Sequence, residues 1–486
     1  MHITPEARWG KHRYPRSMAM DPQASDHPGG YSADWLVPRA PGPVRALVRL
    51  PGSKSMTNRA LVLAALSGAP ADIVGPLVAR DTQLMAAALR TLGWRVDESA
   101  DVWHVEPGLA DGRRAAEIDV GNAGTVLRFL PAVAALTGMD VTFRGDRRVA
   151  ERPVAPLLTA LAALGVKISY PSGGTFPFVV HGRGSVRGGS VILDASSSSQ
   201  LISGLLLSAP RFEVGAVVGH AGPALPSLPH IEMTVAMLRA CGADAVTAEG
   251  SDLGQPQMTG VAATPASQTV TGARQSLRYG WQVPPGPIVA NEIVIEPDLS
   301  NAVPFLAAAL ATGGEVTVAD WPADSLQPAA RIIEVLTAMG ADVGLTPEGL
   351  RVSGSGRISG IGADLSAVGE LTPVLTALAA LASSPSEFTG IGHLRRHESD
   401  RLAALAAEIG KMGGEVTELA DGLAINPRPL RADGVVFDSH DDHRLVMAAA
   451  VLGLVTGGLR VRNAATVGKT FPEFSTYWAR TLAPTG

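Results

Sequence analysis

The sequence predicts an α/β protein of two similar domains, each built from three repeated α/β units. Two patterns that recur along the chain, together with its composition, predict this fold class. One pattern is a helix that ends at a glycine turn and leads into a short strand, and the other is a nearly apolar helix. Of the 486 residues, 46% are apolar and 17% are charged, which is typical of a large globular chain and not of a disordered or fibrous one.

The first pattern is an amphipathic helix that is followed by a glycine and a short strand. Its copies are ALRTLGWRVDE, ALAALGVKISY, MLRACGADAVT, VLTAMGADVGL and EIGKMGGEVTE, with turns at Gly93, Gly165, Gly242, Gly340 and Gly413. The glycines are similarly spaced, except that the segment 249–276 lies between the third and the fourth. The C-terminal PEFSTYWARTL resembles a sixth copy of the helix. Such repetition predicts six similar structural units.

The second pattern is a nearly apolar helix, which we expect to be the buried layer of each unit. Its copies are SMTNRALVLAALSG, NAGTVLRFLPAVAALTG, SSSQLISGLLLSA, LSNAVPFLAAALATGG, VGELTPVLTALAALASS and DDHRLVMAAAVLGLVTGG. A helix that is apolar all round needs other layers around it, and six units divide naturally into two groups of three. The predicted domains are residues 55–295, and residues 35–54 together with 296–486.

Two segments do not follow the repeat. Residues 1–34 are polar, rich in Pro and Gly and without periodicity, so we expect a disordered N-terminal extension. Residues 249–276 have a similar composition and are expected to form a long surface loop inserted into the first domain.

Composition also narrows the classes of partner. The net charge of −5 gives no electrostatic footprint for nucleic acid. The single cysteine, Cys241, excludes an internal disulfide framework and a cysteine-rich metal site. No apolar run is long enough to span a bilayer, and the N-terminus has no secretory h-region. We therefore expect a cytoplasmic protein that binds neither nucleic acid nor membranes.

Polar and basic residues gather where the predicted helices begin. Ser and Asn at these positions are explained by helix capping, but Arg and Lys are not, because the positive end of the helix dipole repels cations. If the helix ends of both domains converge on one cleft, the cleft will attract anionic ligands. The residues are Lys54, Ser55, Arg59, Asn122, Gly124, Arg128, Arg148, Arg152, Ser198, Ser199, Gln200, Ser227, His230, Asp298, Glu370, His397, Glu398, Arg401, His443, Arg444 and Lys469.

Familiar nucleotide and metal motifs do not account for these residues. A P-loop requires Gly-x4-Gly-Lys-Ser/Thr, but Ser53 precedes Lys54 and Val48 occupies the earlier glycine position. No Gly-x-Gly-x-x-Gly opens a helix after a strand near the N-terminus. The pair His440 and His443 has no third ligand in a recognisable pattern, so metal binding is the less favoured interpretation. We predict no metal site.

Ten short stretches, which occur in the order found in the family, resemble the 5-enolpyruvylshikimate-3-phosphate synthase family. Their amino-acid sequences are closest to those of the actinobacterial branch. They cover the chain from about Trp35 to the C-terminus. The stretches are PGSKSMTNRAL (51–61), GNAGTVLRF (121–129), GDRRVAERPVAPL (145–157), DASSSSQLISGLLL (194–207), LPSLPHIEMT (225–234), EPDLSNA (296–302), GELTPVL (369–375), RRHESDRL (395–402), DDHRLVMA (441–448) and GKTFPEF (468–474).

The resemblance implies the enolpyruvyl transferase fold, an inside-out α/β barrel of six units in two domains, with the active site in the cleft between them. It implies transfer of the enolpyruvyl group from phosphoenolpyruvate to the 5-hydroxyl of shikimate 3-phosphate, with release of phosphate. This reaction belongs to the shikimate pathway to chorismate and the aromatic amino acids. The implied partners are these two small molecules. No cofactor is implied, a monomer is expected, and inhibition by glyphosate is expected from the family.

The resemblance also implies which residues bind each substrate. Lys54 should contact both, and Arg59 should hold the carboxylate of shikimate 3-phosphate through its two-pronged guanidinium. The other residues implied for shikimate 3-phosphate are Ser55, Ser198, Ser199, Ser227, Glu370 and His397. Those implied for phosphoenolpyruvate are Asn122, Gly124, Arg148, Gln200, Arg401, Arg444 and Lys469.

Glu370, Glu398 and Lys54 are the implied catalytic residues. One group must take the proton from the 5-hydroxyl, and another must deliver a proton to the methylene carbon of phosphoenolpyruvate. The chain departs from the family pattern at several of these positions. Glu370 stands where many members have Asp, and His230, His393 and His397 stand where Tyr, Asn and Lys are frequent.

Two other functions stay open on the sequence alone. The sister enolpyruvyl transferase that acts on UDP-N-acetylglucosamine has a similar fold, but it typically carries a cysteine in the loop equivalent to Gly145–Pro153, and this chain has no cysteine there. It also has Asn where this chain has Ser55. A non-catalytic anion-binding scaffold is the second alternative, and the intact set of acidic and basic residues argues against it.

Overall fold

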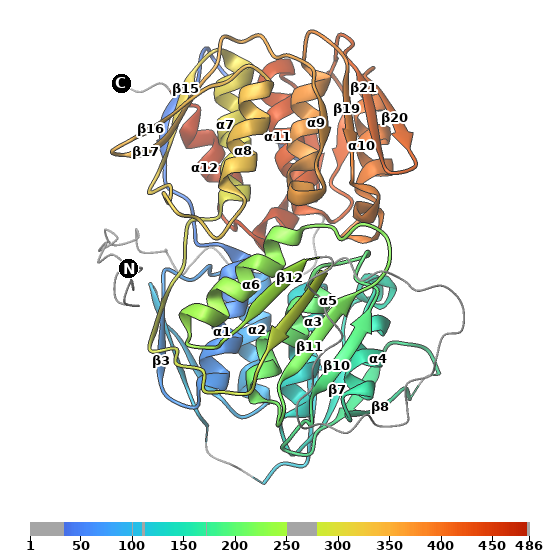
Figure 1. The fold of residues 1–486 in the computed structure, drawn as a ribbon. Coiled ribbons are helices and arrows are strands. Elements are labelled where there is room, and N and C mark those ends of the chain that lie inside the picture. Colours follow the sequence, from blue (N-terminus) through green and yellow to red (C-terminus); the bar gives the residue numbers. More distant parts are fainter. Residues whose placement is uncertain (1–33, 100, 109–111, 172, 250–278, 484–486) are drawn as a thin grey trace.

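Nearly apolar helices alternate along the chain with amphipathic ones, and the predicted α/β fold class is confirmed by the computed structural model (Figure 1). The structure describes residues 34–99, 101–108, 112–171, 173–249 and 279–483. The apolar set is α1 (Lys54–Ser67), α3 (Gly124–Ala135), α5 (Gln200–Ser208), α7 (Leu299–Thr312), α9 (Thr372–Ala380) and α11 (His443–Thr456). The second set is α2 (Arg80–Thr91), α4 (Ala155–Ala163), α6 (Leu228–Ala240), α8 (Ala329–Ala338), α10 (Arg401–Lys411) and α12 (Phe474–Thr481).

The glycine turns of the repeat have the backbone conformation that requires glycine. Their φ angles are positive, from 83° at Gly242 to 107° at Gly93. An L side chain is strained in this region. Glycine therefore ends the helix and turns the chain back toward the sheet in each of these units.

Each pair of helices is covered by one small sheet. In the first body the sheets are β14 (Glu292–Val294), β3 (Ala71–Val74), β5 (Val102–Glu106) and β4 (Arg95–Ser99); β6 (Ala115–Asp119), β7 (Asp140–Arg144), β9 (Phe178–His181) and β8 (Lys167–Ser169); and β10 (Gly189–Leu193), β11 (Ala216–His220), β13 (Tyr279–Val283) and β12 (Val246–Glu249). In the second body they are β16 (Asp342–Thr346), β17 (Gly349–Ser353), β15 (Glu315–Ala319) and β2 (Arg45–Val48); β18 (Gly362–Asp364), β19 (Ser386–Thr389), β21 (Gly422–Asn426) and β20 (Glu415–Leu419); and β1 (Trp35–Leu36), β23 (Arg460–Arg462) and β22 (Val436–Asp438).

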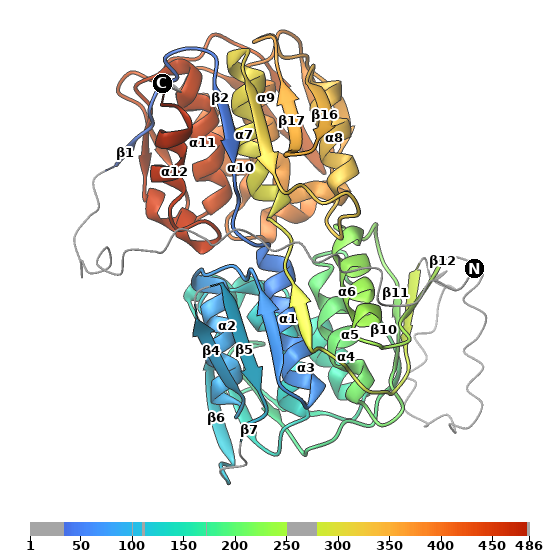
Figure 2. The same cartoon turned by 90° about the vertical axis from the view of Figure 1, so that its left-hand side faces the viewer.

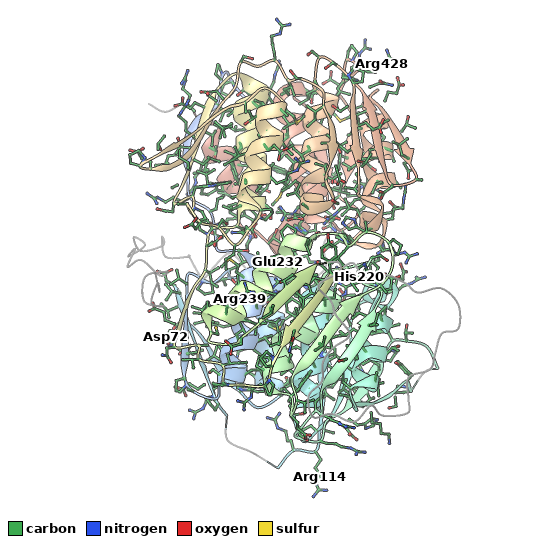
Figure 3. All side chains as sticks on the ribbon, in the orientation of Figure 1. Asp72, Arg114, His220, Glu232, Arg239 and Arg428 are labelled. Atoms are coloured by element: carbon green, nitrogen blue, oxygen red, sulfur yellow. The ribbon has the colours of Figure 1, made fainter. Side chains whose placement is uncertain are left out.

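The described apolar residues form two separate buried cores, one in each body. The first core includes residues from Met56 to Ile295, and the second joins Val37, Val44 and Val48 to residues from Leu299 onward. The apolar helices lie inside each body and the sheets lie outside (Figure 2). Charged side chains such as Arg114 and Arg428 project outward at the far ends of the two bodies (Figure 3).

Two strands are exchanged between the bodies. β2 precedes α1 in the chain but pairs in parallel with β15, whereas β14 precedes α7 but pairs in parallel with β3. The chain therefore crosses between the bodies twice, and the crossings lie side by side (Figure 2). Ser53 N donates to Glu296 O at 2.8 Å, and Asp298 N donates to Pro51 O at 2.9 Å. A Cβ at Gly52 would lie 2.2 Å from Gly75 O, so only glycine fits this crossing.

Gln327 braces the second crossing. Its Oε1 accepts from Leu299 N at 3.0 Å, and its Nε2 donates to Pro297 O at 2.8 Å and to Glu296 Oε2 at 2.9 Å. The amide is buried, and these contacts use both ends of it. They hold the start of α7 against the crossing and fix where its N-terminus points.

The inserted segment joins two adjacent strands. β12 ends at Glu249, which pairs with Tyr279 at the start of β13, so the first residue of the expected loop 249–276 belongs to a strand. Residues 250–278 lie outside the described residues, as do residues 1–33 of the expected N-terminal extension. Within the described part of the chain, no helix is long and apolar enough to cross a membrane.

Candidate active site

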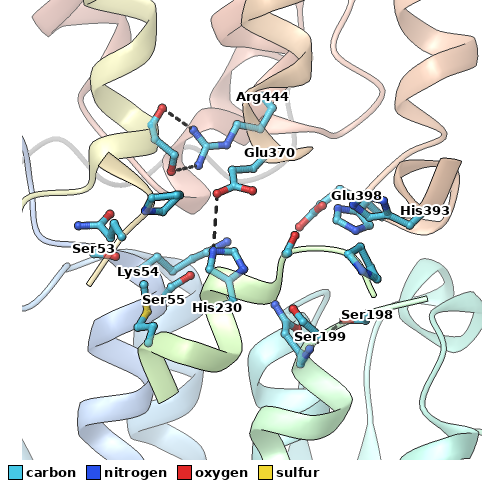
Figure 4. Close-up of a pocket in the computed structure, with 18 of the residues that line it drawn as sticks. Ser53, Lys54, Ser55, Ser198, Ser199, His230, Glu370, His393, Glu398 and Arg444 are labelled. Atoms are coloured by element: carbon cyan, nitrogen blue, oxygen red, sulfur yellow. Dashed lines mark hydrogen bonds and ion pairs between the residues drawn. The ribbon is translucent and has the colours of Figure 1, made fainter. Parts of the chain in front are cut away.

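The N-termini of helices from both bodies converge on one pocket at their junction (Figure 4). α1, α5 and α6 reach it from the first body, and α7, α10 and α11 reach it from the second. The pocket is lined by Ser53, Lys54, Ser55, Arg128, Arg152, Ser197, Ser198, Ser199, Gln200, Pro226, Ser227, His230, Met233, Asp298, Leu299, Ser300, Gln327, Pro328, Ile332, Glu370, His393, His397, Glu398, Arg401, His443 and Arg444. Cations, carboxylates and small hydroxyl groups predominate in this lining.

Lys54 is the first residue of α1, and it lines the pocket. Its Nζ is 3.4 Å from Asp81 Oδ2, and its side chain is 18% exposed. Burial lowers the pKa of Lys54; Asp81 opposes this shift, and Lys469 and Arg444 add to it. The helix dipole disfavours a cation at this position, so the ammonium group is available to a ligand of negative charge.

Glu398 lies at the centre of a cluster of cations from both bodies. Its carboxylate accepts from Lys469 Nζ at 3.1 Å and from Arg401 Nη2 at 3.1 Å, and it lies 3.9 Å from Arg152 Nη2. Burial raises the pKa of Glu398, but Lys469, Arg152 and Arg401 outweigh burial and hold the pKa well below its usual value. Glu398 is thus ionised at neutral pH while these cations remain bound to it.

Asp442 fixes the arginines of this cluster. It is the N-cap of α11 and accepts from Arg444 N at 2.9 Å. Its two oxygens also accept from Arg401 Nε at 2.8 Å and from Arg401 Nη2 at 3.2 Å. The buried carboxylate of Asp442 therefore caps α11 and orients the guanidinium of Arg401 at the start of α10. Two parallel hydrogen bonds to one carboxylate are the geometry that arginine favours.

Arg444 lines the pocket and binds the first turn of α7. It donates to Ser300 Oγ at 2.6 Å, to Ser300 O at 3.0 Å and to Asn301 Oδ1 at 3.1 Å (Figure 4). Burial lowers the pKa of Arg444, and Asp298 and Glu370 oppose this shift. The guanidinium is therefore held rigidly at the edge of the pocket.

Gly124 brings two further arginines together at the start of α3. A Cβ at this position would lie 2.6 Å from Arg152 Nη2 and 2.9 Å from Arg128 Nη1. Arg128 Nη1 donates to Gln200 Oε1 at 3.0 Å, and Arg152 Nη1 donates to Asn122 O at 2.9 Å. The glycine leaves the space in which both guanidinium groups face the pocket.

Serine hydroxyls line the part of the pocket that belongs to the first body. Ser198 and Ser199 directly precede α5, and Ser227 is the N-cap of α6. Ser227 has φ 52°, and its N–H donates to Ser366 O of the second body at 2.8 Å. These hydroxyls, next to the amide N–H groups of helix N-termini, form a suitable site for an anion such as a phosphate.

Glu370 faces His230 across the junction. Glu370 belongs to the 3-10 helix η5 (Ser366–Leu371), and its Oε1 lies 3.6 Å from His230 Nε2 (Figure 4). His393 lies in η6 (Gly392–Arg396), and His397 follows it. Burial lowers the pKa of His393 to about 4 and holds the pKa of His397 well below its usual value. These two imidazoles are therefore neutral at pH 7.

Most of the residues predicted for the site line the pocket, and three of the others support it from behind. Lys469, at the end of η7 (Ala464–Lys469), reaches Glu398, and its Nζ also donates to Asn122 O at 3.1 Å. Asn122 O accepts from Arg152 as well. Gly124 sits beneath Arg152 and Arg128.

Two further predicted residues also lie outside the lining. Arg59 belongs to α1 and is 1% exposed, and its guanidinium donates to Ser55 O, Thr234 Oγ1, Ser203 Oγ and His230 O. Arg148, in η2 (Arg147–Glu151), pairs with Glu151 and donates to Glu398 O at 3.2 Å. Arg152, from the same loop, has its guanidinium in the pocket.

Several residues of the site were not predicted as ligands from the sequence. Asp81 and Asp442 act on the pocket through other side chains, whereas Gln327 lines it and also holds the start of α7. No local pattern separates these residues from ordinary capping residues. Arg152 belongs to the polar set found at the helix starts, but the sequence does not tell which arginine of its loop turns inward. The structure also separates His440 from His443, because His440 Nε2 contacts Glu408 at 2.9 Å whereas His443 lines the pocket.

Cys241 does not belong to the site. It is the C-cap of α6 and is 5% exposed. Burial raises the pKa of its thiol to about 11. A thiolate nucleophile is therefore disfavoured at this position.

Comparison with known proteins agrees with this architecture. The chain matches the structure of EPSP synthase from Acinetobacter baumannii with a TM-score of 0.72 at 24% identity, over 93% of this chain and 98% of that one. A second EPSP synthase structure from this organism gives 0.68 at 23% identity, over 92% and 97% of the two chains. The enolpyruvyl transferase NikO from Streptomyces tendae gives 0.66 at 16% identity, over 92% and 97%. These likenesses show the fold.

The family is shown by a sequence model that spans nearly the whole chain. The model of EPSP synthase, 3-phosphoshikimate 1-carboxyvinyltransferase, matches residues 38–276 and 267–478. The two matched ranges include the pocket and the ten motifs that carry the resemblance. The chain therefore belongs to the EPSP synthase family, the 3-phosphoshikimate 1-carboxyvinyltransferases.

Proposed function

We propose that the two substrates of this transferase bind side by side in the pocket, with shikimate 3-phosphate on the first body and phosphoenolpyruvate between the cations of both. The family reaction moves the enolpyruvyl group from phosphoenolpyruvate to the 5-hydroxyl of shikimate 3-phosphate and releases phosphate, a step of the shikimate pathway. The cation cluster around Glu398 is the observation that carries the proposal. It gathers Arg152, Arg401 and Lys469 from distant parts of the chain at one point.

Phosphoenolpyruvate, a small trianion, is assigned to this cluster. Arg401, Arg444 and Lys469 surround its site from the second body, and Gln200 and Arg152 complete it from the first. Lysine and arginine bind phosphate and carboxylate through charge-assisted hydrogen bonds. On this view Asn122 and Gly124 act by holding Lys469 and the arginines, while Arg148 acts from the rim through Glu398 O.

Shikimate 3-phosphate is assigned to the helix starts of the first body. Ser198, Ser199 and Ser227 bind its phosphate through their hydroxyls, and Ser55, His397 and Glu370 contact the sugar-like ring. Arg59 retains its predicted role on the substrate carboxylate, but its buried position requires the carboxylate to approach the start of α1. In the described structure Arg59 anchors Ser55 and His230 by their carbonyl groups, so it also shapes this half of the pocket.

Proton transfer is assigned to the three predicted catalytic residues. Glu370 accepts the proton of the 5-hydroxyl while the oxygen of that hydroxyl attacks C2 of phosphoenolpyruvate. At the same time an acid supplies a proton to C3 of phosphoenolpyruvate. Glu398 or Lys54 serves as this acid. The resulting tetrahedral adduct then returns a proton from the new methyl group as the C2–O bond to phosphate breaks. These steps use side chains alone and need no cofactor.

The acidity of Glu398 depends on the same cations that bind the substrate. When phosphoenolpyruvate takes the donors of Lys469 and Arg401 from Glu398, the pKa of Glu398 rises because burial then acts against the ionised form. Glu398 can therefore hold a proton only when its neighbours are engaged by an anion. Transfer of these hydrogen-bond donors from Glu398 to phosphoenolpyruvate would allow Glu398 to deliver a proton only when phosphoenolpyruvate is bound.

We further propose the domain boundaries and the form of the enzyme. The domains are residues 55–295, and residues 35–54 with 296–486; the two buried cores and the two crossings beside Gly52 and Pro297 support this division. The pocket is complete within one chain, which supports a monomer. We also propose a cytoplasmic location, because the substrates are small metabolites of biosynthesis.

Phosphate release measured with purified protein tests the proposed function. Phosphoenolpyruvate together with shikimate 3-phosphate should give phosphate and the enolpyruvyl product, and neither substrate alone should. UDP-N-acetylglucosamine in place of shikimate 3-phosphate should give no turnover. Turnover with the nucleotide sugar would contradict the assignment, and so would the absence of turnover with both acceptors.

A further inference from the structure

The Glu370 carboxylate has one basic side-chain group within 4 Å in the described part of the chain. His230 Nε2 lies 3.6 Å from Glu370 Oε1, and the two side chains are 20% and 18% exposed (Figure 4). Among the described residues none donates a hydrogen bond to this carboxylate. A catalytic base needs a fixed direction toward the proton that it takes. His230 is therefore the group of this chain that is placed to supply that direction.

His230 itself is held rigidly at the start of α6. Its N–H donates to Ser227 O at 2.9 Å. Its carbonyl oxygen accepts from Arg59 Nη2 at 2.8 Å and from Thr234 Oγ1 at 3.0 Å. The imidazole thus projects from a backbone that is fixed on both sides.

The contact between His230 and Glu370 joins the two bodies. His230 belongs to α6 of the first body and Glu370 to η5 of the second. The same two elements are connected by the bond from Ser227 N to Ser366 O at 2.8 Å. Separation of the bodies would break both contacts together, so the imidazole meets the carboxylate only when the pocket is closed.

We propose that His230 is a positioning residue for Glu370, and that closure of the two bodies brings its imidazole against the carboxylate and turns the proton-accepting oxygen toward the substrate hydroxyl. The proposal rests on the assigned role of Glu370 as the base. A shift of a few tenths of an ångström brings the 3.6 Å contact within hydrogen-bond range. Contacts of this kind are often longer before substrate binds.

The charges around the pair favour a neutral imidazole. Burial lowers the pKa of His230; Glu370 opposes the shift and Arg59 adds to it. A neutral imidazole can donate one N–H to the carboxylate without adding a cation, and a cation would weaken Glu370 as a base. The other charged or titratable groups that act on this pair are Lys54 and Asp298 on the side of His230, and His393, Arg401 and Arg444 on the side of Glu370.

Three variants at His230 test the proposal, each checked for folding by circular dichroism. His230→Gln keeps a neutral donor, and its kcat should stay within about threefold of the parent, whereas His230→Phe should lower kcat by about 10–100-fold with KM for shikimate 3-phosphate changed only a few-fold. His230→Lys places a permanent cation beside Glu370. It should move the acidic limb of the kcat/KM profile to lower pH by about 1 unit.

His104→Lys is the matched control, because it makes the same exchange on the surface of the first body, where His104 pairs with Asp72. Its acidic limb should coincide with that of the parent. The proposal is overturned if His230→Lys leaves the limb where the control has it, or if His230→Phe keeps the parental kcat.

If His230→Lys does not fold, equal losses in His230→Gln and His230→Phe overturn the proposal. The proposed function fails by a different result, the absence of phosphate release by the parent. Full turnover by Glu370→Gln would remove the assigned base, on which the positioning role of His230 rests, and leave the function in place.

Discussion

Single residues decide how charge is balanced in this pocket. Lys54 stands at the positive end of α1, where the helix dipole opposes it, and its partner Asp81 lies 3.4 Å away. Glu398 in turn holds Lys469 and Arg401 in place. The unfavourable placement of Lys54 is explained if both substrates bring negative charge to it. Before the substrates bind, the carboxylate of Glu398 reduces the repulsion among the remaining cations.

Replacement of Lys54 by Met tests its contact with both substrates. The variant keeps an unbranched side chain, one atom shorter, and removes the charge. We expect a loss of more than about 3 kcal/mol of transition-state stabilisation, or roughly a hundredfold or more in turnover. Steady-state phosphate release measures it. Near-normal activity would remove Lys54 from the mechanism and leave its position at the helix start as a matter of capping.

Replacement of Gly124 by Ala tests the site assigned to phosphoenolpyruvate. The added methyl would meet the guanidinium ends of Arg152 and Arg128 within 3 Å, and these flexible ends can move without unfolding the protein. Affinity for phosphoenolpyruvate should fall, affinity for glyphosate should fall further because the inhibitor is longer, and binding of shikimate 3-phosphate should be retained. Gly138→Ala is the control, since a Cβ there meets nothing within 4 Å. Unchanged inhibition by glyphosate in the Gly124 variant would contradict this assignment.

At the scale of elements, the site consists of helix starts and the short segments beside them. The sequence predicts the helices well, because glycines with positive φ end them and apolar residues fill their faces. The predicted domain bounds place β2 with the second body and β14 with the first, but the sequence does not give their partners, β15 and β3, because pairing between strands far apart in sequence leaves no local pattern. For the same reason it does not distinguish Arg148 from Arg152, whose directions depend on how η2 packs against the other body.

The histidines of η6 predict a pH dependence of stability. Burial lowers the pKa of His393 to about 4 in the folded state, below the value of about 6.5 for an unfolded chain. The unfolded state therefore binds more protons between these values, and stability is lost as pH falls from about 6.5 toward 4. His393→Gln should reduce the loss between pH 7 and pH 5 by about 1–2 kcal/mol. Denaturant unfolding at both pH values measures it, and an equal loss in parent and variant would contradict burial of His393 as the cause.

At the scale of the whole molecule, the pocket exists only where the two bodies meet. Lys469 reaches Asn122 across the junction, Arg148 reaches Glu398 O, and Ser227 reaches Ser366. The sequence places cations at helix starts in both halves, but which contacts join the halves depends on how the bodies are oriented. Catalysis and closure therefore depend on many of the same side chains.

The combined field of the cations predicts a salt dependence. Several fixed positive charges act on two polyanionic substrates, and added salt screens this attraction. KM for both substrates should rise several-fold between about 0.05 and 0.5 M potassium chloride, while kcat at saturation changes less. Initial rates across this range measure it. KM values that do not respond to salt would contradict an electrostatic origin of binding.

The central claim is that a base on the second body acts on an acceptor bound mainly by the first, and Glu370→Gln tests it most directly. The amide can still contact the 5-hydroxyl but cannot take its proton. Phosphate release and calorimetric titration are measured on one preparation of the variant. We expect turnover to fall by about 10²–10⁴-fold, with binding of shikimate 3-phosphate within a few-fold of the parent. A variant that unfolds more easily but turns over normally would contradict the claim, and the base would then be Glu398 or Lys54.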